Sequence, residues 1–136
     1  MACEFCSASG GQVLWQGPVC RVVYVDEPGY PGFCRVIWNA HVKEMTDLDE
    51  RDRAHFLQAV FAVEAVLRRL LNPEKINLAC LGNLTPHLHW HVIPRHADDP
   101  HFPLPIWAPA QRAPLRAADP ALPLRIAEAL AASLAD

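Results

Sequence analysis

The chain has no apolar run long enough to cross a lipid bilayer, although 51% of its 136 residues are hydrophobic. Its first residues, MACEFCSASGG, lack the basic start and the apolar stretch of a secretory signal peptide. No block of like charge occurs, and the formal net charge is only -3. We therefore expect a cytoplasmic protein with no membrane partner and no general nucleic-acid-binding surface, because the latter needs a basic patch.

The sequence also lacks an even set of cysteines. Its five cysteines argue against a disulfide framework. Cys20, Cys34 and Cys80 lie in the apolar runs VCRVVYV, FCRVIW and INLACLG, so we expect them to be small buried hydrophobes. Cys3 and Cys6 form a C-x-x-C motif near the N-terminus, a spacing at which two thiolates can hold one zinc ion.

Regions rich in β-branched and aromatic residues predict the strands. They cover residues 19–25, 33–38, 75–81 and 88–93, and residues 13–17 add a short first strand. DEPGYPG and GNLTP, rich in turn-forming residues, predict turns between neighbouring strands. No repeat and no second domain are visible, so we expect a single domain over residues 1–136.

One long helix is predicted over residues 47–71. Thr46 suits the N-cap position, and the acidic residues that follow suit the positive end of the helix dipole. A wide apolar stripe along this segment predicts a face packed on the core. Asn72-Pro73 ends the helix, because the residue before a proline disfavours helical geometry.

Most of the prolines lie in residues 94–123, which excludes regular helix or central strand there. We expect this segment to wrap the surface in extended form, followed by a short amphipathic helix in LPLRIAEALAASLA. The order of elements favours an α+β fold, with an antiparallel sheet of about five strands and the long helix packed on it. A parallel βαβ arrangement is the less favoured alternative.

The stretch PHLHWHVIPR holds three histidines at alternate positions, His87, His89 and His91. In a strand these imidazoles share one face, while Leu88, Trp90 and Val92 point to the other. Three interpretations follow: a solvated polar face, a metal site, or a catalytic site in which one imidazole reacts. The spacing alone does not separate the last two.

HLHWHVI resembles the His-φ-His-φ-His-φ-φ signature of the histidine triad family, in which φ is apolar. The preceding strand and glycine-containing turn, the following Pro94-Arg95, the long helix and the two early strands extend the resemblance over about residues 3–95. Residues 96–136 are similar to the tail of a compact bacterial branch. The resemblance implies the histidine triad fold.

The resemblance implies a nucleotide hydrolase or nucleotidyl transferase. Its substrates would be dinucleoside polyphosphates, nucleoside phosphoramidates or nucleotide sugars. His89 would attack the α-phosphorus and form a covalent nucleotidyl-histidine, which water or another acceptor resolves. His91 would contact the phosphate and help the leaving group depart. A backbone carbonyl near the third histidine would hold the nucleophile, and this chemical step would need no metal.

Two further binding residues follow from the resemblance. Asp26 would bind the ribose hydroxyls, although it could equally be a solvated turn aspartate. Asn83 would contact phosphate through its amide, with a turn asparagine as the alternative. Leu84 stands where many members have a hydroxyl residue, and Thr85 is displaced by one position. That departure puts the hydroxyl contact in doubt.

The resemblance also implies a structural zinc site formed by Cys3, Cys6, His41 and His87, leaving His89 and His91 for chemistry. The alternative is a frayed N-terminus with free thiols and a surface His41. The remaining histidines are expected on the surface or in loops; they are His55, His96 and His101.

Family members are commonly homodimers joined through the helix and the sheet edge, so a homodimer is expected. Phe102 and Trp107 in the proline-rich segment would cap the nucleotide site or the partner subunit, or belong to a simple surface wrap. Two other functions remain open at this point. One is a non-catalytic nucleotide-binding or adaptor protein, and the other is a metal-dependent protein whose metal site is the triad itself.

Overall fold

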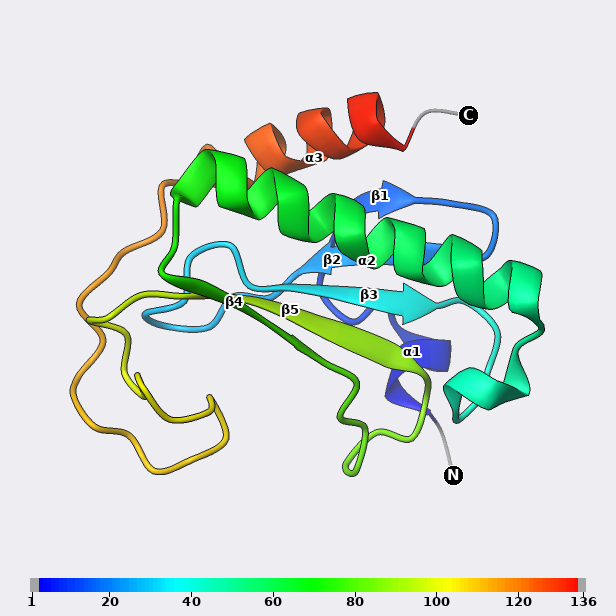
Figure 1. Ribbon diagram of the computed structural model, residues 1–136, viewed down its shortest axis with the longest axis horizontal. Coiled ribbons are helices and arrows are strands. Elements are labelled where there is room, and N and C mark those ends of the chain that lie inside the picture. The colour runs from blue at the N-terminus through cyan, green and yellow to red at the C-terminus, as the bar shows by residue number, and fades with distance from the viewer. Residues whose placement is uncertain (1–2, 135–136) are drawn as a thin grey trace.

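The computed structural model describes residues 3–134 and contains one five-stranded sheet (Figure 1). Its strands are β1 (Gln12–Gln16), β2 (Cys20–Tyr24), β3 (Cys34–Trp38), β4 (Lys75–Ala79) and β5 (His89–Arg95). They lie in the order β1-β2-β3-β5-β4, and every neighbouring pair is antiparallel. The α+β expectation is confirmed, and the parallel alternative is wrong. Residues 1–2 and 135–136 of the predicted domain lie outside the described residues.

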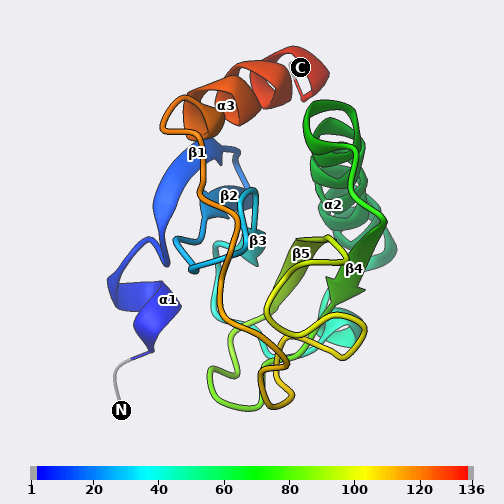
Figure 2. The same ribbon diagram turned by 90° about the vertical axis from the view of Figure 1, so that its left-hand side faces the viewer.

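Two helices cover one face of the sheet. They are α2 (Glu50–Leu71) and α3 (Leu122–Ser133), while the short helix α1 (Glu4–Ser7) lies on the opposite side (Figure 2). Val22, Val36 and Val92 are fully buried under α2, whose Phe56 and Val60 join the same apolar cluster. Burial of this apolar area is the main force that holds helix and sheet together. The face with α1 is therefore the one on which polar groups collect.

The predicted start of the long helix is wrong. Residues Met45–Asp47 form a separate 3₁₀ turn, and α2 begins only after Asp49, whose side chain accepts a hydrogen bond from the Asp52 amide. Leu48 between them is extended and is buried in the core. Burying Leu48 interrupts the helix, so Asp49 rather than Thr46 is the N-cap. The predicted end is confirmed, since Asn72 closes α2 in the left-handed conformation.

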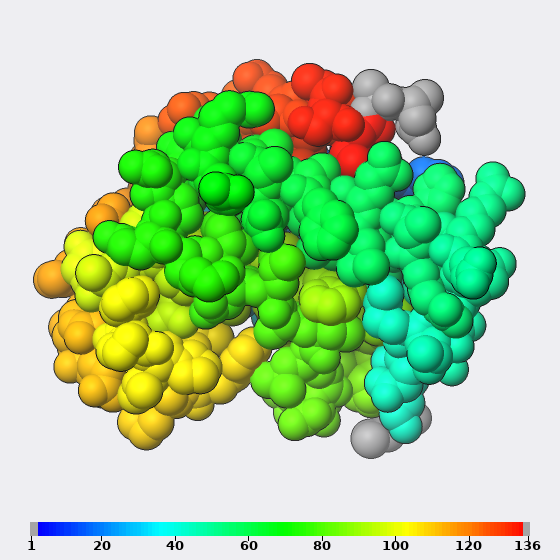
Figure 3. Space-filling view, in the orientation of Figure 1, coloured from blue at the N-terminus to red at the C-terminus, as the bar shows by residue number. Residues whose placement is uncertain are grey.

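The proline-rich segment is anchored by one buried ion pair. The Arg95 Nε at the end of β5 lies 2.7 Å from the Asp99 carboxylate. Asp99 also accepts hydrogen bonds from the Tyr30 hydroxyl and from the His101 and Phe102 amides. In the space-filling view this yellow and orange segment forms a compact mass beside the C-terminal part of α2 (Figure 3). This ion pair fixes the start of the segment, whereas residues 109–120 are exposed and contain no helix or strand, as a surface wrap requires.

Two side-chain expectations need correction. Cys20 and Cys34 are buried as expected, but Cys80 is exposed because it follows the end of β4. His96 lies in a loop but is buried, with its ring near the carboxylate of Glu74. His55 is exposed on α2, as expected. No helix within residues 3–134 combines the length and apolarity needed to cross a membrane.

Candidate functional site

The register of the sheet places two triad histidines on the face opposite α2. His89 pairs with Ile37 of β3, and His91 pairs with Arg35. The residues between and beside them, Leu88, Trp90 and Val92, pack in or against the main core. Strand alternation therefore separates imidazoles from apolar side chains as expected. His87 precedes the first residue of β5 but is also buried, with 1% of its surface exposed.

The His89 ring is fixed by its own strand. Its Nδ1 lies 2.5 Å from the backbone carbonyl of His87. A carbonyl only accepts, so Nδ1 carries the proton and Nε2 keeps a free lone pair. The Phe5 ring packs edge-on against His89, with centroids 4.9 Å apart. Burial lowers the pKa of His89, and the positive charge of Arg35 lowers it further, so the imidazole is neutral at pH 7.

His91 has the opposite arrangement of its two nitrogens. Its Nε2 donates to the carbonyl of Leu81 at 3.1 Å. Its Nδ1 is buried without a hydrogen-bond partner among the described residues. Burial lowers the pKa of His91 to about 4. The His91 ring lies 4.8 Å from that of His89 and 5.1 Å from that of Trp107, so Trp107 of the proline-rich segment reaches the triad.

His89 and His91 line a cavity of about 420 Å³, here called the triad cavity. It is lined by Glu4, Phe5, Arg35, Leu81, Asn83, Leu84, Thr85, His89, His91 and Trp107. These residues come from α1, β3, the loop after β4, β5 and the proline-rich segment. Gly82 lets that loop approach closely, since a Cβ there would lie 2.9 Å from the Thr85 carbonyl oxygen. Asn83 lines the triad cavity with the two histidines, and its contact with phosphate stays a prediction.

Beside the cavity, Cys3, Cys6, His41 and His87 bring one ligand atom each into a cluster within 4.8 Å. The His87 Nδ1 lies 3.3 Å from the Cys3 sulfur, 3.5 Å from the Cys6 sulfur and 3.2 Å from the His41 Nδ1. Ligand atoms bound tetrahedrally to zinc, at about 2.3 Å for sulfur and 2.0 Å for nitrogen, are themselves about 3.3–3.8 Å apart. The predicted four residues therefore lie close enough to hold a metal ion.

A neighbouring carbonyl sets the protonation of His87. The His87 Nε2 donates to the Trp38 carbonyl at 2.6 Å. The proton therefore sits on Nε2, and the lone pair of Nδ1 faces the cysteine sulfurs. A ligand histidine whose second nitrogen donates to a carbonyl is the usual support of a metal site. The His87 ring thus lies in the cluster with Cys3, Cys6 and His41 and does not line the triad cavity.

Arg21 holds the N-terminal segment on the sheet, and the sequence reasoning missed it. Its guanidinium donates to the backbone carbonyls of Phe5 and Ser9 at 2.8 and 2.9 Å. Arg21 itself is buried in β2. The available signal was an arginine inside the apolar run VCRVVYV, because a buried cation needs acceptors. Through this contact the sheet positions both Phe5 and the adjacent cysteines.

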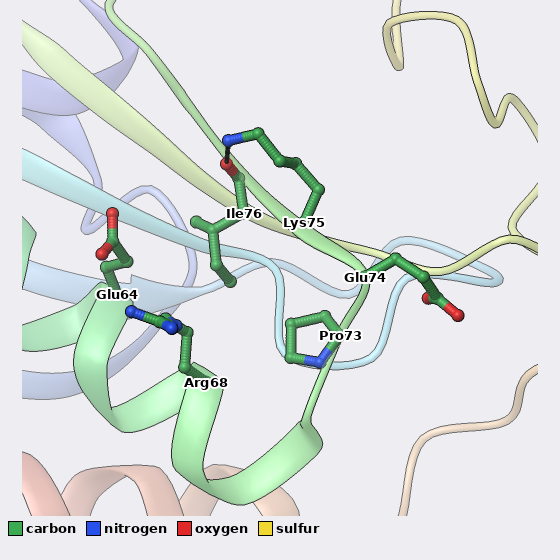
Figure 4. Close-up of a pocket in the computed structure, with 6 residues that line it drawn as sticks. All are labelled: Glu64, Arg68, Pro73, Glu74, Lys75 and Ile76. Carbon is green, nitrogen blue, oxygen red and sulfur yellow. Dashed lines mark hydrogen bonds between the residues drawn. The ribbon is translucent and has the colours of Figure 1, made fainter.

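The structure does not bring Asp26 to the triad cavity. Asp26 lines a separate hollow of about 250 Å³ with Tyr30, Pro114 and Arg116. Another hollow, of about 280 Å³, lies at the C-terminal end of α2 (Figure 4). There Glu64 and Arg68 extend from neighbouring turns of the helix, opposite the segment that leads into β4. Neither hollow contains a triad histidine.

Comparison with known proteins agrees with this geometry. A histidine triad protein from Bradyrhizobium japonicum superposes with a TM-score of 0.75 at 28% identity, covering 92% of this chain and 91% of that one. One from Sinorhizobium meliloti gives 0.70 at 27% identity, with 85% of each chain covered. One from Marinobacter aquaeolei gives 0.74 at 22% identity, covering 98% of this chain and 95% of that one, and shows the shared fold.

Among curated proteins, an AP-4-A phosphorylase from Mycobacterium tuberculosis is 28% identical over 98 residues. The match covers 68% of this chain but 50% of the relative, so the chain spans about half the length of that curated protein. The model of the HIT domain family matches residues 8–98, which include the triad and the sheet that carries it. With its three alternating histidines at the start of an inner strand of an antiparallel sheet, this chain belongs to the HIT domain family.

Proposed function

We propose that this chain is a nucleotide hydrolase or nucleotidyl transferase that acts at the α-phosphate through a covalent nucleotidyl-histidine on His89. The observation that carries the proposal is the bond from the His89 Nδ1–H to the His87 carbonyl. It leaves the Nε2 lone pair of a neutral imidazole for attack in the triad cavity. The AP-4-A phosphorylase relative supports the same class of substrate, a nucleotide with a phosphate-linked leaving group.

In the first step the His89 Nε2 forms a bond to the α-phosphorus, and the bond from phosphorus to the leaving group breaks. The imidazole becomes a cation, and the His87 carbonyl stabilises that charge through the Nδ1–H. When the anionic phosphate binds, it favours the protonated form of His91, whose Nδ1 takes up a proton from water. His91 then passes this proton to the leaving group. The buried Nδ1 without a partner supports this role, since it needs a group from the substrate.

In the second step water or another acceptor attacks the phosphorus, and the P–N bond to His89 breaks. The acceptor's proton passes to the His91 Nδ1, which restores the protonated form that the bound phosphate favours, and this proton returns to water when the product leaves. Splitting one displacement into two lowers the barrier of each. The amide of Asn83 would donate to a phosphoryl oxygen. The ribose role of Asp26 stays a prediction, although that residue lies outside the triad cavity.

The metal cluster would hold zinc in a closed Cys₂His₂ set with a structural role. Zinc would hold His87 in place, and through the His87 carbonyl it would support the ring of His89. No residue of this cluster other than His87 is part of the triad.

The proposed enzyme works in the cytoplasm as a homodimer. Two exposed features support pairing through α2 and the sheet edge. Phe61 on α2 is 55% exposed, and β4 pairs on one side only, with β5. An open strand edge presents unpaired backbone groups that a second chain can use.

The test compares His89→Ala with His55→Ala, a change at an exposed helix position. A dinucleoside polyphosphate and a nucleoside phosphoramidate serve as substrates, and mass spectrometry follows the nucleotidylated protein. His89→Ala should abolish both turnover and adduct, whereas His55→Ala should retain both. Full activity in His89→Ala would contradict the proposed mechanism. Binding of AMP without turnover of either substrate in the wild type would favour a non-catalytic nucleotide-binding protein.

A further inference from the structure

Arg35 is a charged residue in the middle of the sheet. It is the third residue of the apolar run FCRVIW in β3 and pairs with His91 across the strands. Paired residues share a face, so its side chain lies on the histidine side of the sheet. It also lines the triad cavity together with His89 and His91. A charge at this position costs free energy unless a partner meets it.

Arg35 has fewer partners than the other two arginines of the sheet. Arg21 donates to several carbonyls, and Arg95 forms an ion pair with Asp99 and donates to the Asn77 side chain. The one hydrogen bond recorded for the Arg35 guanidinium runs from Nη1 to the Gly10 carbonyl at 3.1 Å. Its Nε is buried without a partner among the described residues. No ion pair within residues 3–134 includes Arg35.

Aromatic rings hold this guanidinium in place, and no carboxylate among the described residues forms an ion pair with it. Its central carbon lies 5.5 Å from the Phe5 ring centroid and 6.0 Å from that of Phe33. Such aromatic contacts fix the plane of a guanidinium but supply no counter-charge. The rings of His89 and His91 beside it carry no negative charge, so they supply no counter-charge either. Glu4 also lines the cavity, but no ion pair within the described residues joins it to Arg35, so the Arg35 Nε stays without an acceptor.

We infer that Arg35 is a substrate-binding residue that receives the phosphoryl oxygens of the nucleotide beside His89. The inference rests on the proposed function and deepens it, because it names the group that meets the phosphate charge. A planar guanidinium matches two phosphoryl oxygens at once. It also meets the charge that spreads over those oxygens during phosphoryl transfer. The 5′-phosphate of a nucleotide, and not its base or ribose, is the part that Arg35 recognises.

The test measures binding of AMP and of adenosine to the zinc-loaded protein by calorimetry, so that it needs no turnover. In Arg35→Met, which keeps an unbranched apolar stem, AMP affinity should fall about 10- to 100-fold. Adenosine affinity should stay within about twofold of the wild type, which a general loss of structure would not permit. Arg68→Met, at a helix position outside the triad cavity, controls for the loss of one positive charge.

Arg35→Lys keeps the inference falsifiable if Arg35→Met does not fold. Lysine retains the charge but cannot span two oxygens, so the preference for AMP over adenosine should fall several-fold. An unchanged preference in the folded variant, or a wild type that binds AMP no better than adenosine, overturns the inference. The proposed function fails separately, when His89→Ala keeps full turnover. If His89→Ala loses turnover while Arg35→Met keeps the preference for AMP, the proposed function stands and only the role of Arg35 is contradicted.

Discussion

The Nδ1–H of His89 donates to the backbone carbonyl of His87, two residues earlier in the chain. The side chain of His87 faces away from the triad cavity and into the cluster with Cys3, Cys6 and His41. His87 therefore has two roles. Its ring is a candidate metal ligand, and its backbone carbonyl is the acceptor that sets the tautomer of His89, the candidate nucleophile. A change in this cluster should therefore lower turnover, although a metal bound there would not contact the substrate.

Removal of the metal ligands is the first prediction. Cys6→Ser should reduce bound zinc from one ion per chain to well below that, because structural zinc sites need all four ligands. Turnover should fall about 10- to 100-fold, as expected when a supporting contact of a site is lost. Elemental analysis and steady-state kinetics measure the two effects.

Two variants serve as controls for the zinc prediction. Cys80→Ser, at an exposed thiol outside the cluster, should keep its zinc. His89→Ala should also keep its zinc while losing turnover. Zinc loss in His89→Ala would instead mean that the triad itself is the metal site.

The second prediction concerns the buried ion pair of Arg95 with Asp99. Asp99→Asn should lower the free energy of unfolding by about 3–5 kcal/mol, because it leaves the buried guanidinium without its counter-charge. The adjacent Asp98 pairs with Arg116 at the surface, where both side chains are more than 40% exposed. Asp98→Asn should change stability little. Urea unfolding of the three proteins checks this, and equal losses for both variants would contradict it.

Acid should remove the contribution of Asp99. Burial raises the pKa of its carboxyl, but hydrogen bonds from Arg95 and from the His101 and Phe102 amides outweigh this and lower the pKa to about 2. An aspartate in the unfolded chain titrates near about 3.9. The contribution is therefore complete above about pH 4 and is lost as the pH falls towards 2. The stability difference between wild type and Asp99→Asn should shrink over this window, and a constant difference would count against the pair.

The third prediction concerns Trp107, which lies 5.1 Å from the His91 ring by centroids and is 52% exposed. A half-exposed indole at the cavity gives a nucleotide base or leaving group a surface for stacking. Trp107→Ala should raise the KM about 5-fold or more and change kcat less. Leu104→Ala changes an exposed apolar residue of the same segment outside the triad cavity. If both variants raise KM equally, the effect belongs to the segment and not to the indole.

The fourth prediction concerns the proposed dimer. Phe61→Glu should shift the chain towards monomer, because a carboxylate would be buried without a partner in an interface through α2. Leu124→Glu, on α3 and also exposed, should leave the mass unchanged. Light scattering at several protein concentrations gives the mass. A monomeric wild type would contradict this prediction directly.

The face that each residue of β5 presents was predictable from the sequence, because strand alternation is a local property. Strand alternation assigned His89 and His91 to one face of the sheet and Trp90 and Val92 to the other. The start of α2 was not predictable in this way. Thr46 and Asp49 are both good N-caps, and the burial of Leu48 in the core decided between them.

The residues of the site also divide into features that the sequence predicted and features that it did not. Residue types and a family resemblance predicted the candidate metal cluster. The fold brings its four residues, which are far apart in the chain, close enough to hold one ion. Cys80 shows where that reasoning failed, whereas the ribose role of Asp26 stays a prediction. Cys80 lies in an apolar run but beyond the end of its strand, and Asp26 follows a strand but lines another hollow. Exposure and proximity depend on what packs against a residue, which neighbouring sequence does not specify.

By itself the sequence determined the α+β class, the long helix and the strand that carries the triad, since hydrophobic periodicity and turn residues act locally. Only the tertiary structure decided which carbonyl holds His89, which acceptors meet Arg21, and that the Arg35 Nε has no acceptor among the described residues. It also decided that Trp107 reaches His91. Some of these contacts join segments that are far apart in the chain, and others join a loop to the strand that follows it. Packing of the whole sheet fixes both kinds.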